Sequence, residues 1–207
     1  MIFGKIDYLN LLPFYLFLQQ KVPKISKFIK GVPSEINRAF HNRKVDIAFI
    51  SSITSQKSHC SSLGIIARKE VLSVLVLDGE TKKDSASETS NRLADILNIE
   101  GEVLIGDKAL NYYFKNPNNV IDLALEWNKK YKSPFVFARL CFHKNRRVIT
   151  FIENRFRKER IYIPQYIIKR VSKKLGISKG EINIYLSKID YRCDKKSRKG
   201  FDKFIKL

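Results

Sequence analysis

Short apolar runs alternate with segments of helical periodicity along most of this chain, and this alternation constrains the fold more than any other feature. Apolar runs of strand length followed by helix-period stretches are the sequence form of an α/β protein. Beyond residue 163 the periodicity predicts helices alone. We therefore predict an α/β fold. The expected strands are residues 4–9, 45–50, 71–77, 103–105 and 134–138.

Several residues mark where the predicted helices begin. Asn10 stands at an N-cap position, ahead of an apolar helical stretch. Ser85 and Glu88 have the spacing of a capping box, and so do Ser178 and Glu181. These pairs predict helices that start directly after Ser85 and Ser178.

Composition narrows the class of protein. With 207 residues and 44% hydrophobic content, the chain can bury one generous core or two small lobes, and disorder is excluded. The longest apolar run, residues 9–18, is interrupted and falls short of the roughly 20 residues of a membrane span. No secretory signal follows Met1, so we expect a cytoplasmic protein without a membrane partner.

Three widely spaced cysteines, Cys60, Cys141 and Cys193, predict neither a disulfide framework nor a zinc site.

The net charge of +20 points to an anionic partner without naming it. Residues 144–207 hold 20 basic against 6 acidic side chains and so carry most of this charge. Basic residues at 169–174 and 195–199 leave a nucleic-acid-binding module open as a rival function. No aromatic stacking platform accompanies them, so we do not expect a nucleic-acid partner. A lysine-rich proteome would produce the same excess.

The sequence lacks the motifs that mark most classes of enzyme. The glycines form neither a dinucleotide fingerprint nor a P-loop, and no G-x-S-x-G or H-E-x-x-H occurs. The histidines, His41, His59 and His143, are scattered. We expect no metal site.

Small polar residues remain as candidates, at the predicted strand ends and helix starts. Unpaired main-chain N–H groups at such junctions favour anions, so the predicted ligand carries carboxylates. Ser73 lies inside an apolar strand, where its hydroxyl needs a backbone partner or a ligand. The alternative is that Asn10, Ser87 and Asp107 only cap their own helices. The junction residues are Asn10, Ser51, Ser52, Ser87, Thr89, Ser90 and Asp107.

Ordered motifs extend over nearly the whole chain. Through them the sequence resembles the chorismate dehydratases of the futalosine route to menaquinone. One departure is Arg139, where that pattern has an apolar residue. The motifs are Gly4-Lys5-Ile6-Asp7-Tyr8-Leu9-Asn10, Val45-Asp46-Ile47-Ala48 with Ser51-Ser52, Ser73-Val74-Leu75, Ser87-Glu88-Thr89-Ser90, Leu104-Ile105-Gly106-Asp107, Pro134-Phe135-Val136-Phe137-Ala138 and Ile189-Asp190-Tyr191-Arg192.

The resemblance implies a two-lobed fold like that of type II periplasmic solute-binding proteins, with the ligand between the lobes. One lobe would comprise residues 1–72 and 142–207, and the other residues 73–141. It also implies that chorismate loses water to give 3-[(1-carboxyvinyl)oxy]benzoate. Because this elimination forms an aromatic ring, no cofactor is expected. A non-catalytic binding protein for a small anion, with the same fold, stays open as an alternative.

The resemblance also implies roles for the candidate residues. Asn10 and Ser73 would be catalytic. Thr89 and Ser90 match the family's Thr-Ser pair and would bind substrate, together with their neighbour Ser87. From their junction positions we expect Ser51, Ser52 and Asp107 to bind substrate as well. Since neutral amides and hydroxyls are poor proton acceptors, we expect a carboxylate of the substrate to act as the base.

Overall fold

Two β-sheets organise the protein. The computed structural model describes residues 1–22, 27–159 and 161–207. The larger sheet has the strand order β2-β1-β3-β8-β4-β9, with β1, β2 and β3 parallel and the pairs β3–β8, β8–β4 and β4–β9 antiparallel. Its strands are β1 (Ile2–Lys5), β2 (Lys27–Lys30), β3 (Ile47–Ser51), β4 (Cys60–Ala67), β8 (Phe135–Phe142) and β9 (Ile189–Arg192).

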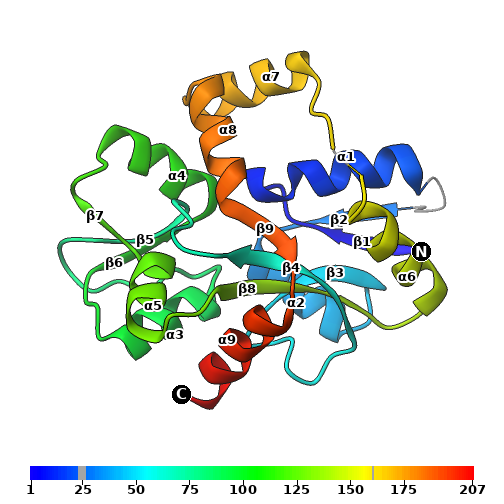
Figure 1. The fold of residues 1–207 in the computed structure, drawn as a ribbon, viewed down its shortest axis with the longest axis horizontal. Helices are drawn as coiled ribbons and strands as arrows, with labels where there is room; N and C mark the ends of the chain where they lie inside the picture. Colours follow the sequence, from blue (N-terminus) through cyan, green and yellow to red (C-terminus); the bar gives the residue numbers. More distant parts are fainter. Residues whose placement is uncertain (23–26, 160) are drawn as a thin grey trace.

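The smaller sheet has three antiparallel strands in the order β6-β5-β7. Three helices accompany it, and all six elements form the green side of Figure 1. The strands are β5 (Val74–Leu77), β6 (Glu102–Ile105) and β7 (Val120–Asp122), and the helices are α3 (Glu88–Leu97), α4 (Gly106–Lys115) and α5 (Leu123–Tyr131).

Of the remaining helices, α1, α2, α6 and α9 lie around the larger sheet, and α8 contacts its strand β9. Helix α7 packs against α8 and contacts α4 of the smaller unit (Figure 1). Aromatic packing fixes the N-terminal core: the Phe14 ring meets the Phe49 ring edge-on, with centroids 4.9 Å apart. No helix in the described ranges is long and apolar enough to span a bilayer. The helices are η1 (Leu9–Leu11, a 3-10 turn), α1 (Leu12–Lys21), α2 (Pro33–His41), α6 (Arg146–Phe156), α7 (Gln165–Leu175), α8 (Lys179–Lys188) and α9 (Lys195–Lys206).

The chain crosses between the sheets twice, at neighbouring points. It leaves the larger sheet after Ala67 and returns at Phe135, and these two residues are paired across β4 and β8. The Asn128 amide donates to the main-chain oxygens of Arg68, at 3.0 Å, and of Ser133, at 3.3 Å, and so ties the crossings together. The predicted division into lobes stays a prediction, but β8 pairs in the larger sheet, so the boundary between sheets falls before Phe135.

Local sequence patterns misplaced several boundaries. The first strand ends at Lys5 instead of residue 9, because the chain turns into η1, where the Leu11 N–H donates to the Tyr8 oxygen at 3.0 Å. The C-terminal part is not purely helical, since β9 pairs with β4. Strands β2, β4 and β7 were not predicted. Short strands such as these are stabilised by pairing partners far away in sequence, which periodicity does not reveal.

The two predicted capping boxes had different outcomes. Ser178 and Glu181 form theirs: the Glu181 N–H donates to the Ser178 hydroxyl at 3.1 Å, and the Ser178 N–H donates to the Glu181 carboxylate at 2.6 Å. Ser85 does not cap α3. The N-cap is Ser87, whose hydroxyl accepts from the Ser90 N–H at 3.2 Å, so the helix begins at Glu88.

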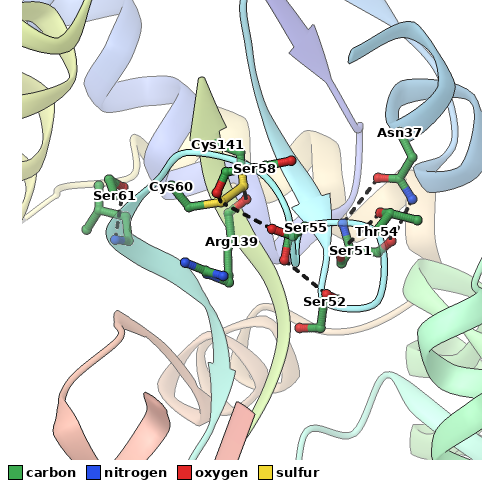
Figure 2. Close-up of a disulfide and its surroundings, with 11 residues drawn as sticks. Asn37, Ser51, Ser52, Thr54, Ser55, Ser58, Cys60, Ser61, Arg139 and Cys141 are labelled. Carbon is green, nitrogen blue, oxygen red and sulfur yellow. Dashed lines mark hydrogen bonds between the residues drawn. A yellow bond between two sulfur atoms is a disulfide. The ribbon is translucent and has the colours of Figure 1, made fainter. Parts of the chain in front are cut away.

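A disulfide joins Cys60 to Cys141, although the number and spacing of the cysteines predicted no disulfide framework (Figure 2). The two residues are 81 positions apart, but β4 and β8 place them directly opposite each other. Cysteine spacing could not indicate this pair, because the register between the strands brings it together. Cys193 is free and buried. No cluster of three or more potential metal ligands occurs among the described residues.

Candidate active site

A cavity lies between the two sheets and is lined from both. Its volume is about 80 Å³, counted as the space that the centre of a water molecule can reach. Five predicted site residues line it: Asn10, Ser51, Ser73, Ser87 and Ser90. The other lining residues are Ile6, Tyr8, Leu11, Pro33, Phe49, Ile65, Val71, Val74, Ile105, Gly106, Phe137 and Ala138.

Four helices begin at this cavity. Leu11 precedes α1, Pro33 opens α2, Ser87 caps α3 and Gly106 opens α4, and all four residues line the cavity. Helix N-termini carry partial positive charge and unpaired N–H groups. None of the lining residues in the described part of the chain is a lysine or arginine. The arrangement therefore favours an anion held by neutral donors.

Asn10 does not cap a helix, contrary to the alternative considered for it. It lies inside η1, and neither η1 nor α1 has a side-chain cap. Its Oδ1 atom is buried and has no hydrogen-bond partner among the described residues. Such an atom costs free energy unless a ligand or water satisfies it. The amide is thus available to the cavity.

Ser73 accepts two hydrogen bonds from other residues of the protein. Its main-chain oxygen accepts from the Gly106 N–H at 2.8 Å, and its Oγ accepts from the Tyr185 hydroxyl at 3.0 Å. The side chain is 2% exposed, so these bonds satisfy part of the cost of burying it. In these bonds the Ser73 hydroxyl only accepts, so its hydrogen is available to a ligand.

The start of α3 brings two serines to the cavity. Ser87 caps the helix, as the alternative expected, and its hydroxyl lies 2.8 Å from that of Ser90. Both also line the cavity, so capping and contact with a ligand are compatible here. Thr89 points elsewhere: its Oγ1 accepts from the Ile53 N–H at 3.3 Å, which links α3 to the loop after β3.

The side chains of Ser51 and Ser52, at the end of β3, point in opposite directions. Ser51 lines the cavity, and its hydroxyl accepts from the Asn37 amide at 2.6 Å and lies 2.9 Å from the Thr54 hydroxyl (Figure 2). Ser52 is fully buried and its hydroxyl donates to the Val136 main-chain oxygen. Successive side chains in a strand point to opposite faces. Ser52 therefore holds β8 and does not line the cavity.

Asp107 follows the lining residue Gly106 and does not itself line the cavity. Its carboxylate accepts from the Leu9 N–H at 2.9 Å, which anchors the turn that carries Asn10. Burial raises the pKa of Asp107, and the Leu9 hydrogen bond opposes the rise. The structure thus gives Asp107 a positioning contact rather than the predicted contact with a ligand.

Tyr8 is a lining residue that the sequence did not indicate. Burial raises the pKa of its phenol to about 12, with further contributions from Asp84 and Asp107, so the hydroxyl stays protonated at neutral pH. Its ring lies against Gly106, where a Cβ atom would come within 2.6 Å of the ring. Gly106 also has a φ of +65°, which favours glycine.

We expect Gly106→Ala to destabilise the protein by about 1–3 kcal/mol, because the methyl group meets both the strained backbone and the Tyr8 ring. Thermal unfolding measures the effect. Gly180→Ala is the matched control, since its Cβ would lie no closer than 3.8 Å to another residue, and should be neutral or slightly stabilising. An equal response of the two variants would contradict the role given to Gly106.

Arg139, the departure from the family pattern, lies outside the cavity. Ala138 lines the cavity, whereas Arg139, the next residue of β8, lies outside the lining. There the Arg139 guanidinium lies 4.6 Å from the centroid of the Phe201 ring. The departure therefore leaves the cavity lining unchanged.

Comparison with known proteins identifies the family. A family model described as menaquinone biosynthesis matches residues 1–100 and 94–207. The chain belongs to this family. It is also 40% identical over 215 residues to a chorismate dehydratase of Campylobacter jejuni subsp. jejuni serotype O:23/36 (strain 81-176), and the match covers 100% of this chain and 96% of that protein. The resemblance inferred from the ordered motifs is confirmed.

Solved structures support the fold of this family member. A protein of Archaeoglobus fulgidus superposes with a TM-score of 0.68 at 12% identity, covering 99% of this chain and 95% of that one. The periplasmic aliphatic sulphonate binding protein of Escherichia coli superposes with a TM-score of 0.53 at 12% identity, covering 100% and 85%. The predicted α/β, periplasmic-binding-protein-like fold is confirmed.

Proposed function

We propose that the chain is a chorismate dehydratase, which eliminates water from chorismate to give 3-[(1-carboxyvinyl)oxy]benzoate. The observation that carries this proposal is its full-length similarity to a chorismate dehydratase within a menaquinone biosynthesis family. We further propose that it acts in the cytoplasm, on the futalosine route to menaquinone. The binding roles predicted for Ser52, Thr89 and Asp107 are not retained, because these residues do not line the cavity and their side chains bond to main-chain groups elsewhere.

The cavity supports this substrate. Chorismate carries two carboxylates, and the four helix N-termini supply N–H donors and partial positive charge for them. Ser51, Ser87 and Ser90 add hydroxyl groups at the wall. Apolar residues such as Phe49 and Phe137 provide surface for the carbon ring. We assign the three serines to binding.

The elimination needs a group that accepts a proton. A ring C–H bond breaks, its electrons complete the aromatic ring, and the C–O bond to the departing hydroxyl breaks, so that proton and hydroxide leave as water. No carboxylate, histidine or lysine lines the cavity in the described part of the chain. We propose that a carboxylate of the substrate takes the ring proton, while Asn10 and Ser73 hold the reacting groups in place.

Incubation of the purified protein with chorismate tests the proposal. We expect a new aromatic absorbance and a product lighter than chorismate by one water, at a rate proportional to protein concentration. Chorismate alone in the same buffer is the control. Recovery of unchanged chorismate after demonstrated binding would overturn the proposal in favour of a non-catalytic binding protein.

A further inference from the structure

Tyr185 is a fully buried phenol whose contact with the site the sequence does not indicate. It lies on α8, 112 residues away from Ser73, and its side chain is 1% exposed. Its hydroxyl donates to the Ser73 Oγ at 3.0 Å. Burial raises its pKa, and the side chains of Ser73 and Asn10 oppose the rise without cancelling it. The phenol is therefore protonated at neutral pH and can donate.

This bond dictates the direction of the Ser73 hydroxyl. A serine hydroxyl has one hydrogen to donate, and it accepts through its lone pairs. Because Tyr185 occupies one lone pair, the Ser73 hydrogen is directed away from Tyr185. Ser73 lines the cavity, so the hydrogen can meet a substrate oxygen there. Without the phenol, the same hydroxyl could rotate between several positions.

The segment that carries Tyr185 also holds the second candidate catalytic residue. Tyr191, three residues beyond the end of α8, donates from its hydroxyl to the main-chain oxygen of Asn10 at 2.6 Å. Its ring is fixed in turn against Phe156, with centroids 5.2 Å apart. Residues 179–192 thus contact both Asn10, on the side of the larger sheet, and Ser73, at the edge of the smaller one.

We propose that Tyr185 is a positioning residue for the dehydration, acting through Ser73 by fixing its hydroxyl as a donor toward the cavity. This inference rests on the proposed role of Ser73. It predicts that the phenol hydroxyl contributes to turnover only when Ser73 is present. A purely structural role would predict the same loss with or without the serine.

Tyr185→Phe tests this, because it keeps the ring and removes only the hydroxyl. We expect kcat for chorismate to fall about 10-fold or more, with KM changed less than about 2-fold, since the lost orientation weakens mainly the transition state. Ser73→Ala should lower kcat by itself. Adding Tyr185→Phe to Ser73→Ala should then cost less than about 2-fold further. Tyr166→Phe, at a tyrosine that is 70% exposed, is the matched control.

The outcomes distinguish a wrong role for Ser73 from a wrong role for Tyr185. If Ser73→Ala turns over normally, the proposed role of Ser73 is wrong. If Ser73→Ala is impaired but Tyr185→Phe is fully active, or if the two losses multiply, the inference about Tyr185 is overturned. If Tyr185→Phe does not fold, a second measurement that keeps Tyr185 in place tests the same inference. The hydroxyl proton of Tyr185 should show an NMR shift on product binding that is absent in Ser73→Ala, and an unchanged proton would also overturn the inference.

Discussion

Asn10→Ala should lower kcat/KM for chorismate by about 100-fold or more, the usual cost of removing one preorganised polar contact from an active site. The same change should leave the free energy of unfolding nearly unchanged or slightly higher. The reason is that Oδ1 of Asn10 is buried without a partner among the described residues, so its removal relieves a desolvation cost. Steady-state kinetics and chemical denaturation measure the two quantities.

Opposite effects on activity and stability would distinguish a ligand contact from a structural one. Asn119→Ala is the matched control, because Asn119 is exposed and lies away from the cavity lining. It should change neither quantity. Normal turnover by Asn10→Ala, or a large loss of stability, would contradict the role proposed for the amide.

Asp122→Ala should lower the free energy of unfolding by about 3 kcal/mol or more. The buried Asp122 carboxylate accepts four main-chain N–H groups. Two belong to the first crossing, Val71 at 2.8 Å and Leu72 at 2.7 Å, and two to the start of α5, Ala124 at 2.9 Å and Leu125 at 3.1 Å. Alanine leaves all four donors without this acceptor. Urea unfolding, read at constant m-value, gives the change.

The crossing that Asp122 holds is strained. Leu72 has a φ of +60°, which is uncommon for any residue except glycine, and it directly precedes Ser73. Asp122→Ala should therefore lower activity as well, even though Asp122 does not line the cavity. Asp95→Ala removes an exposed ion pair with Lys83 and is the matched control, with an expected cost below about 1 kcal/mol. A comparable cost for the two variants would show that the carboxylate does not anchor the crossing.

Much of the site was predictable because strand ends and helix starts gather at one place in an α/β fold. Asn10, Ser51, Ser87 and Ser90 were recognised in this way, and they line the cavity. Ser73 was recognised by its hydroxyl inside an apolar strand. The sequence could not show which neighbours point away. Ser52 is one position from Ser51, and yet its hydroxyl bonds to β8.

The partners of these residues were not predictable. Tyr185 fits the apolar stripe of a helix, and nothing in that pattern tells that its hydroxyl meets Ser73. Cys60 and Cys141 are likewise paired by the register of two strands rather than by their spacing. Contacts between distant parts of a chain depend on tertiary packing, which composition and periodicity leave undetermined.

The neighbouring crossings make residues 68–134 an insertion into what would otherwise be a β-hairpin. Ala67 and Phe135 face each other across β4 and β8, so a short turn between them would close the larger sheet without disturbing its ladder. The inserted unit supplies β5, the start of α3 and the start of α4 to the cavity. Exchange of this unit would therefore replace seven of the seventeen residues that line the cavity, while the paired strands of the larger sheet stay in place.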